Sequence, residues 1–213
     1  MPDQPDAPST KRPALSPAER IAVAILASAM VGFGIYGVAT GAKSTGGYVI
    51  SVAVVGALVW RVRRAPLPGP LVIALAIDAA LHLAGGLVAV GNDVLYNASI
   101  GPRNAALHTH ILQYDHFVHA FGAFLATLAL WALLAPSTTT AVDRRNLMVL
   151  CVIAGLGIGA VNEVIEFLAT IAHSAAHIGG YNNTGWDLVS NTVGAVAAVP
   201  FMHRVPRGAT GQR

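Results

Sequence analysis

The chain has 213 residues, of which 54% are hydrophobic and 11% are charged, and its formal net charge at pH 7 is +3. Soluble domains contain about 25% charged residues, so this chain has too few charges to cover a water-exposed surface. The composition excludes a soluble enzyme and a disordered chain. A nucleic-acid partner is excluded as well, because the basic residues separate long apolar runs instead of gathering on one face.

Long apolar runs predict an all-α fold, a polytopic bundle of six transmembrane helices. Residues 1–19 hold five prolines among polar residues and predict a disordered cytoplasmic tail. A bilayer core requires about 20 apolar residues per helix, and the predicted transmembrane domain over 20–204 contains six such runs, the second of them short. A second cytoplasmic tail is expected over 205–213. The expected spans cover about 21–40, 46–60, 67–90, 113–135, 147–170 and 185–203.

The positions of the basic residues predict the orientation of these spans. If the N-terminus is cytoplasmic, eleven of the thirteen Lys and Arg residues fall in cytoplasmic segments, and only Lys43 and Arg103 fall outside. Such a bias is typical of membrane proteins and would be lost if one span were added or removed. We therefore expect both termini in the cytoplasm. The cytoplasmic set is Lys11, Arg12, Arg20, Arg61, Arg63, Arg64, Arg144, Arg145, Arg204, Arg207 and Arg213.

Ionisable residues occur inside four of the predicted spans, where lipid disfavours them. An ionised side chain at the bilayer centre costs about 2.5–3.5 kcal/mol on insertion scales. These spans contain no Lys or Arg, so the acids must be protonated, hydrated, paired with histidine or bound to a metal ion. The residues are Asp78 and His82 in the third span, Asp115, His116 and His119 in the fourth, Asn162, Glu163 and Glu166 in the fifth, and Asp187 and Asn191 in the sixth.

The spacing of these residues places them on single helix faces. The pattern D-x3-[HN]-x2-G occurs three times, as DAALHLAG, DHFVHAFG and DLVSNTVG, and ends at Gly85, Gly122 and Gly194. Residues four apart share a face, and small residues allow helices to approach closely. Counted at 1.5 Å per residue, the polar positions of the four spans fall near one depth below the outer boundary. We therefore expect one cluster that opens outward.

A divalent metal ion is a suitable partner for such a cluster. Mixed carboxylate and imidazole ligands suit Zn, Mn or Fe, whereas carboxylate with amide suits Mg or Ca. Paired ligands on helix faces are a known way to build a metal site in a bundle core. Glu163 or Glu166 is the expected general base. The candidate ligands are Asp115, His119, Asp187, Asn191, His82 and Asp78; the roles of His108, His110, His173 and His177, in the outer loops, stay open.

Three stretches resemble the VanZ-like membrane proteins and the related YjdF-type inner-membrane proteins. They are YDHFVHAF (114–121), NEVIEF (162–167) and NTGWDLVSNTVGA (183–195), in the order and spacing of that family. The resemblance implies a bacterial cytoplasmic-membrane protein with a polar set at Asp115, His119, Glu163, Glu166, Asp187, Asn191 and Gly194. VanZ proteins often have Gln in place of Glu166 and an Arg shortly before the last Asp, where this chain has Asn182 and Asn183.

Three functions agree with this pattern. The first is a metal-dependent hydrolase or transferase acting on a lipid-linked or envelope substrate at the outer leaflet. The second is a transporter or proton relay, which requires polar residues toward the inner side, where spans four to six are almost entirely apolar. The third is a non-catalytic membrane protein that binds a lipid headgroup or a partner. The substrate, the metal (Zn, Mn or Mg) and the oligomeric state stay open.

Overall fold

The computed structural model describes residues 14–42, 45–62, 67–101, 103–104, 109–110, 112–135, 143–172 and 181–205. Of the outer-loop histidines, His108, His173 and His177 lie outside these residues. Six α-helices dominate the structure, in agreement with an all-α membrane bundle. Their bounds are α1 Pro17–Thr40, α2 Thr45–Val62, α3 Gly69–Leu87, α4 Tyr114–Leu134, α5 Arg144–Ala172 and α6 Tyr181–Ala197.

Four of these helices are long and apolar enough to cross a bilayer. They are α1, α3, α4 and the part of α5 from Arg144 to Leu168. Among the described residues, α2 and α6 fall outside that set, α6 because its 17 residues span only about 26 Å. The structure therefore supports a multi-pass membrane protein with at least these four candidate spans.

The first helix begins inside the segment that the sequence predicts to be a disordered tail. Ser16 caps it: the Ser16 hydroxyl accepts a hydrogen bond from the Glu19 backbone N–H at 3.3 Å, and the Glu19 carboxylate accepts one from the Ser16 N–H at 2.8 Å. Pro17 occupies the first turn, where its missing N–H costs nothing. Helix α1 thus includes the last three residues of the predicted tail, because a proline at a helix start and a proline outside a helix look alike in sequence.

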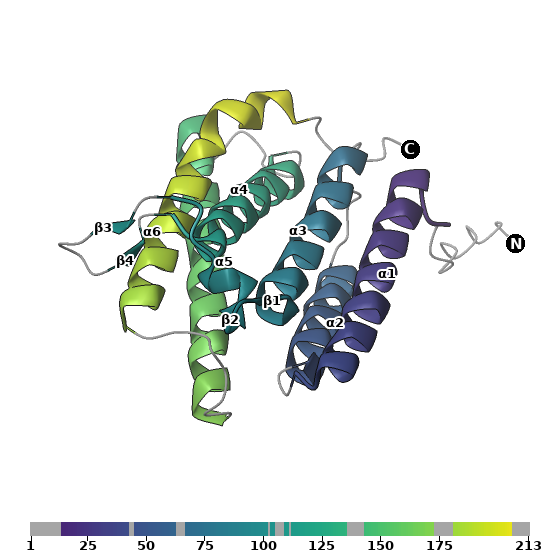
Figure 1. The fold of residues 1–213 in the computed structure, drawn as a ribbon. Coiled ribbons are helices and arrows are strands. Elements are labelled where there is room, and N and C mark those ends of the chain that lie inside the picture. The colour runs from purple at the N-terminus through teal and green to yellow at the C-terminus, as the bar shows by residue number, and fades with distance from the viewer. Residues whose placement is uncertain are drawn as a thin grey trace, which may run out of the picture.

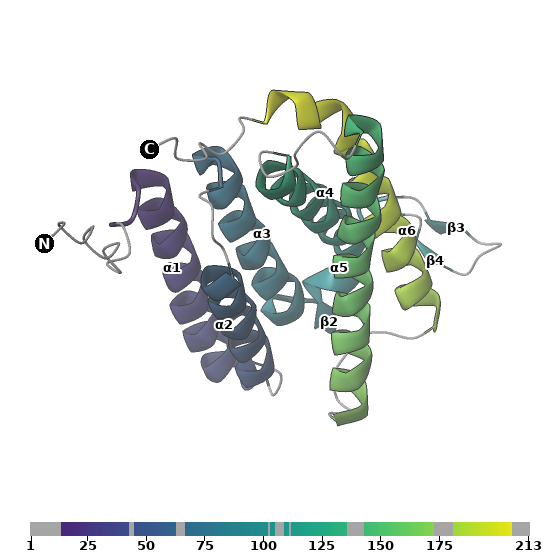
Figure 2. The ribbon, with the colours of Figure 1, turned by 180° about the vertical axis from the view of Figure 1, so that it is seen from behind.

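The helices form two groups that meet along α3 and α4. Figure 1 shows α1, α2 and α3 on one side and α4, α5 and α6 on the other, and Figure 2 shows the same division from behind. Helix α4 packs against α3, α5 and α6, so it is the centre of the second group. The start of α1 and the end of the chain's last helical segment lie at the same end of the bundle (Figure 1).

The last predicted span is divided into two helical segments. Helix α6 starts at Tyr181, before the predicted start at 185, and ends at Ala197. A 3-10 helix, η2, follows over Val199–Arg204, with Pro200 in its first turn. Proline has no N–H for the hydrogen bond of a continuing α-helix, so the helix is interrupted before it.

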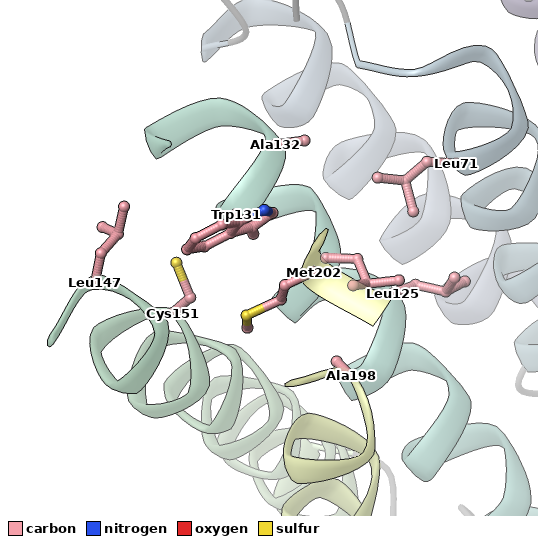
Figure 3. Close-up of a cluster of buried hydrophobic side chains, with 9 residues drawn as sticks. Leu71, Leu125, Trp131, Ala132, Leu147, Cys151, Ala198 and Met202 are labelled. Atoms are coloured by element: carbon pink, nitrogen blue, oxygen red, sulfur yellow. The ribbon is translucent and has the colours of Figure 1, made fainter. Parts of the chain in front are cut away.

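A hydrophobic core fills the end of the bundle that holds η2. Trp131 of α4, Cys151 of α5 and Met202 of η2 converge there, as Figure 3 shows. Leu71 of α3 and Leu147 of α5 belong to the same cluster. These residues come from the start of α3 and α5 and from the end of α4, so the core closes the end of the bundle opposite the polar motifs.

Short strands and turns connect α3 to α4 on the polar side. Strands β1 (Ala89–Val90) and β2 (Asp93–Val94) form a hairpin, and the 3-10 helix η1 (Leu95–Asn97) follows it. A second hairpin pairs β3 (Arg103–Asn104) with β4 (Thr109–His110). The sequence predicts an outer loop here without detecting these strands, because each has only two residues.

The three motif glycines all lie against a neighbouring element, as their spacing predicts. An added Cβ at Gly194 of α6 would overlap the backbone carbonyl of Ala120 in α4. At Gly122 of α4 it would contact the Asp78 carboxylate at 3.2 Å, and at Gly85 it would overlap the ring of Tyr96. Gly122 and Gly194 therefore set how closely the helices carrying the polar residues can approach, whereas Gly85 makes room for the Tyr96 ring.

Replacing Gly194 with Ala tests this close contact. The added methyl group meets backbone atoms that cannot move away, so Gly194→Ala should lower the free energy of unfolding by about 1–3 kcal/mol. Thermal unfolding of the purified protein in detergent measures the change. Gly185→Ala, in the same helix but with no atom within 4 Å of the added Cβ, is the matched control and should be neutral or slightly stabilising. Equal melting temperatures for the two variants would contradict the predicted contact.

Candidate functional site

His119 of α4 is the centre of a buried cluster of acids from three helices. Its Nε2 atom lies 3.2 Å from Oδ1 of Asp115, one turn earlier in α4, and 3.6 Å from Oε1 of Glu166 in α5. Its Nδ1 atom lies 3.0 Å from Oε1 of Glu163, also in α5. The His119 side chain is only 2% exposed, so these contacts form away from bulk water.

Asp187 brings the third helix into the cluster. Its side chain is fully buried, and its Oδ1 atom has no hydrogen-bond partner among the described residues. The ligand atoms of Asp115, His119 and Asp187 all lie within 4.8 Å of one another, and so do those of Glu163, Glu166 and Asp187. The structure thus unites five of the sequence-predicted site residues, and Asp187 belongs to both groups.

Asn191 lies one helical turn after Asp187 and is also buried. Its side chain packs against Gly159 of α5, where an added Cβ would come within 2.6 Å of its Cγ atom. Its Nδ2 atom has no hydrogen-bond partner among the described residues. Asn191 therefore borders the cluster at the contact between α5 and α6.

Asp78 and His82 of α3 lie beside the cluster. Neither belongs to the two groups of close ligand atoms found among the described residues. The His82 ring lies 5.8 Å from the His119 ring, edge to face, and His82 Nε2 lies 3.9 Å from Oδ2 of Asp78. The α3 motif thus reaches the same region without joining the contacts around His119.

Asn183 is a site residue that the sequence does not predict, because it falls just before the last predicted span at 185–203. Its Nδ2 atom donates hydrogen bonds to Oδ2 of Asp115, at 3.2 Å, and to Oδ2 of Asp187. The side-chain amide thus bridges carboxylates on α4 and α6. Because α6 begins at Tyr181, Asn183 precedes Asp187 by four residues on one helix face; this spacing was the available signal once the helix start was known.

Two neighbouring residues serve the local structure. Nδ1 of His116 accepts a hydrogen bond from the backbone N–H of Gln113 at 3.3 Å, which caps the start of α4. The His116 ring also lies 5.9 Å from the ring of Trp186 in α6. In α5, the Asn162 side chain donates a hydrogen bond to Oε1 of Glu166 at 2.7 Å. Asn162 thereby supplies one of the donors that this carboxylate needs.

The charges of the cluster require a cation or protons. Fully ionised, the four carboxylates of Asp115, Glu163, Glu166 and Asp187 with one protonated His119 would carry a net charge of −3. Two like charges 4–5 Å apart repel by roughly 3–4 kcal/mol at an effective dielectric constant of about 20. Helices α3, α4 and α6 contain no Lys or Arg, and the two arginines of α5 are at its far end. A carboxylate and imidazole set of this kind is chemically suited to a divalent cation.

The Asn183 bridge makes a specific prediction for stability. Asn183→Ala removes donors from two buried carboxylates, so it should lower the free energy of unfolding by about 1–3 kcal/mol. Asn182→Ala, at the exposed neighbouring position, is the matched control and should change stability by less than about 0.5 kcal/mol. Chemical or thermal unfolding in detergent measures both. A loss of stability in the control as large as in Asn183→Ala would show that the bridge is unimportant.

The comparisons with known proteins agree with a membrane location. No curated protein and no solved structure matches the chain. Residues 18–208 match the family described as predicted membrane protein (DUF2238). The resemblance to VanZ-like and YjdF-type proteins rests on the sequence motifs alone and stays a prediction. Since the family match spans all six helices and most of the chain, the protein belongs to the membrane protein family DUF2238.

Proposed function

We propose that the protein holds a divalent metal ion at Asp115, His119 and Asp187 and uses it to hydrolyse or transfer a lipid-linked or envelope substrate. The observation that carries the proposal is the Oδ1 atom of Asp187, which is fully buried beside the ligand atoms of Asp115 and His119 and has no hydrogen-bond partner in the part of the chain that the structure describes. A buried oxygen without a donor is costly, and a bound cation would remove that cost. Zn and Mn suit this mixed donor set best, and Mg suits the carboxylates alone.

The two glutamates take different roles in this proposal. Glu163 is 5% exposed and lies 3.0 Å from Nδ1 of His119, so it would accept the Nδ1–H and leave Nε2 free as the ligand atom. This is the usual arrangement of a carboxylate behind a metal-bound histidine. Glu166 is 19% exposed and has Asn162 as a donor, so it is the better-placed general base.

The proposed reaction can be written for hydrolysis. A water molecule beside Glu166 gives a proton to that carboxylate while its oxygen forms a bond to the electrophilic centre of the substrate. The bond to the leaving oxygen then breaks, and the proton held by Glu166 passes to that oxygen. In a transfer reaction an acceptor hydroxyl takes the place of water. The metal supplies the positive charge that stabilises the developing negative charge.

Transport is a weaker explanation of the same residues. A path across the membrane needs polar groups beyond the cluster, but the hydrophobic core around Trp131, Cys151 and Met202 fills that end of the bundle. Thr127, which lies between the two regions on α4, uses its hydroxyl to donate to its own helix at the Ala123 carbonyl, 2.7 Å away. The site is therefore better arranged for binding from one side.

The proposal includes a topology: the chain crosses a bacterial cytoplasmic membrane six times, with both termini in the cytoplasm. The charge bias of the sequence supports this orientation, and it would place the cluster near the outer surface. The arginines at the core end agree with it, since Arg144 lies over the Trp131 ring at 5.4 Å and Arg204 over the Phe201 ring at 5.6 Å. The motif resemblance to VanZ-like and YjdF-type proteins supports the membrane location and the polar site, and it specifies no reaction.

Metal binding is the first test of the proposal. The purified protein, stripped with EDTA and loaded with Zn²⁺, Mn²⁺ or Mg²⁺, should retain one ion by elemental analysis and should melt at a higher temperature. At a free ion concentration 100 times Kd the stabilisation should be about 2.7 kcal/mol. Asp187→Asn should bind the ion at least about 100-fold more weakly. Without metal it should be as stable as the wild type or more so, because it removes one of several crowded acids.

Asp143→Asn is the matched control for metal binding, because Asp143 is an exposed acid just before α5. It should keep wild-type affinity. Failure of the wild type to retain any of the three ions, or equal affinity in both variants, would overturn the metal site. Glu166→Gln should keep the metal and lose activity, seen as a changed lipid profile in cells. A wild-type lipid profile in that variant would favour the non-catalytic binding of a headgroup or partner.

The orientation has its own test, independent of metal. Under the six-span proposal, an impermeant maleimide applied to intact cells should label Ser174→Cys, between α5 and α6, and should leave Ser137→Cys, between α4 and α5, unlabelled. Cys151 is fully buried and should contribute little background. If α2 and α6 do not cross, the label should move to Ser137→Cys, and that result would contradict six spans.

A further inference from the structure

Tyr96 connects the outer turns to the motif of α3. It lies in η1, directly after the first hairpin, and is only 4% exposed. Its ring covers Gly85, where any side chain would overlap the ring atoms. Gly85 ends the α3 pattern D-x3-H-x2-G, but the element that it contacts differs from those that Gly122 and Gly194 contact. In α3 the glycine makes room for a tyrosine.

The hydroxyl of Tyr96 makes two contacts with a single residue, His82. It donates its hydrogen to the backbone carbonyl of His82 at 2.9 Å. The same oxygen lies 2.9 Å from Nδ1 of His82. A tyrosine hydroxyl has one hydrogen and a pKa of about 10, so near neutral pH it can donate once. Because the carbonyl takes that hydrogen, the oxygen can only accept from the ring, and Nδ1 of His82 must carry a proton.

This arrangement determines which atom of His82 is available as a ligand. A neutral imidazole with its proton on Nδ1 has its lone pair on Nε2. Nε2 lies on the side of Asp78, but at 3.9 Å from Oδ2 it is too far for a hydrogen bond. Oδ1 of Asp78 is buried and has no hydrogen-bond partner among the described residues. Nε2 of His82 and the Asp78 carboxylate thus both have lone pairs that could bind a metal ion, and no hydrogen bond joins the two groups. The His82 ring lies next to the His119 ring.

We propose that Tyr96 is a positioning residue that holds His82 in its Nδ1–H form and so presents Nε2, together with Asp78, as ligand atoms beside the His119 cluster. The geometry of Tyr96, Gly85 and His82 carries the assignment of the proton. The ligand role rests in addition on the proposed metal site. A hydrogen bond to the second ring nitrogen is the common way in which proteins orient a histidine ligand.

Nitrogen NMR of the metal-free protein tests the proton assignment directly. In protein labelled with ¹⁵N-histidine, the His82 signals, identified by their loss in His82→Gln, should show a protonated Nδ1 and an unprotonated Nε2 near neutral pH. Tyr96→Phe should shift the population toward the Nε2–H form, and Gly85→Ala should do the same by displacing the ring. An Nε2–H or doubly protonated His82 in the wild type, or an unchanged signal in Tyr96→Phe, would overturn the proposal.

Tyr114→Phe is the matched control for both measurements. Its hydroxyl also donates to a backbone carbonyl of α3, that of Leu81, at 3.0 Å, and its ring lies 6.3 Å from that of Tyr96. It should lose a similar hydrogen bond and leave the His82 signals unchanged. A change as large as that in Tyr96→Phe would show a general loosening of α3.

Zinc titration then tests the ligand role. Tyr96→Phe and His82→Gln should each weaken zinc binding by about 10–100-fold, whereas Tyr114→Phe should keep wild-type affinity. If the wild type binds no metal, the metal function fails while the NMR result still decides the proton assignment. If the wild type binds zinc and Tyr96→Phe binds it equally well, the His119 site stands and the ligand role of His82 fails.

Discussion

The structure depends on the burial of carboxylates around one imidazole, inside a bundle whose other buried residues, in the part of the chain that the structure describes, are mostly apolar. His119 contacts acids on its own helix and on α5, and Asn183 links Asp115 to Asp187 on α6. These interactions require α4, α5 and α6 to approach closely, which the contact of Gly194 with Ala120 permits. Apolar side chains would hold three helices together at lower cost, which is the physical reason for proposing that the cluster serves binding.

Much of the fold and part of the site could be predicted from the sequence. Apolar run length predicts the approximate positions of the six helices, and four of these helices are long and apolar enough to cross a bilayer. Spacings of three and four residues place Asp115 with His119, and Glu163 with Glu166, on shared faces, and the structure brings these faces together around His119. The glycine at the end of each motif lies at a close contact, as small residues on an inward face should.

Other features were beyond prediction because they depend on where helices end and on contacts between distant segments. The role of Asn183 depends on where α6 starts, and the role of Tyr96 depends on the path of the turns after α3. Neither the start of α6 nor the path of these turns is visible as a periodic pattern in the sequence. Pro17 and Pro200 show the same difficulty at helix ends, since one proline begins a helix and the other interrupts one. The distinction between Glu163 and Glu166 also requires the structure, because only the fold makes one of them more exposed.

The hydrophobic core around Trp131, Cys151 and Met202 has a consequence for energetics across the membrane. If the proposed site at His119 binds an ion or a proton, the apolar side chains at this end of the bundle leave the opposite end for exchange with the solution. The occupancy of the site would then follow the ionic composition and pH of the compartment at that opposite end. Because no charge would cross the membrane, the membrane potential would do no net work in a cycle of binding and release.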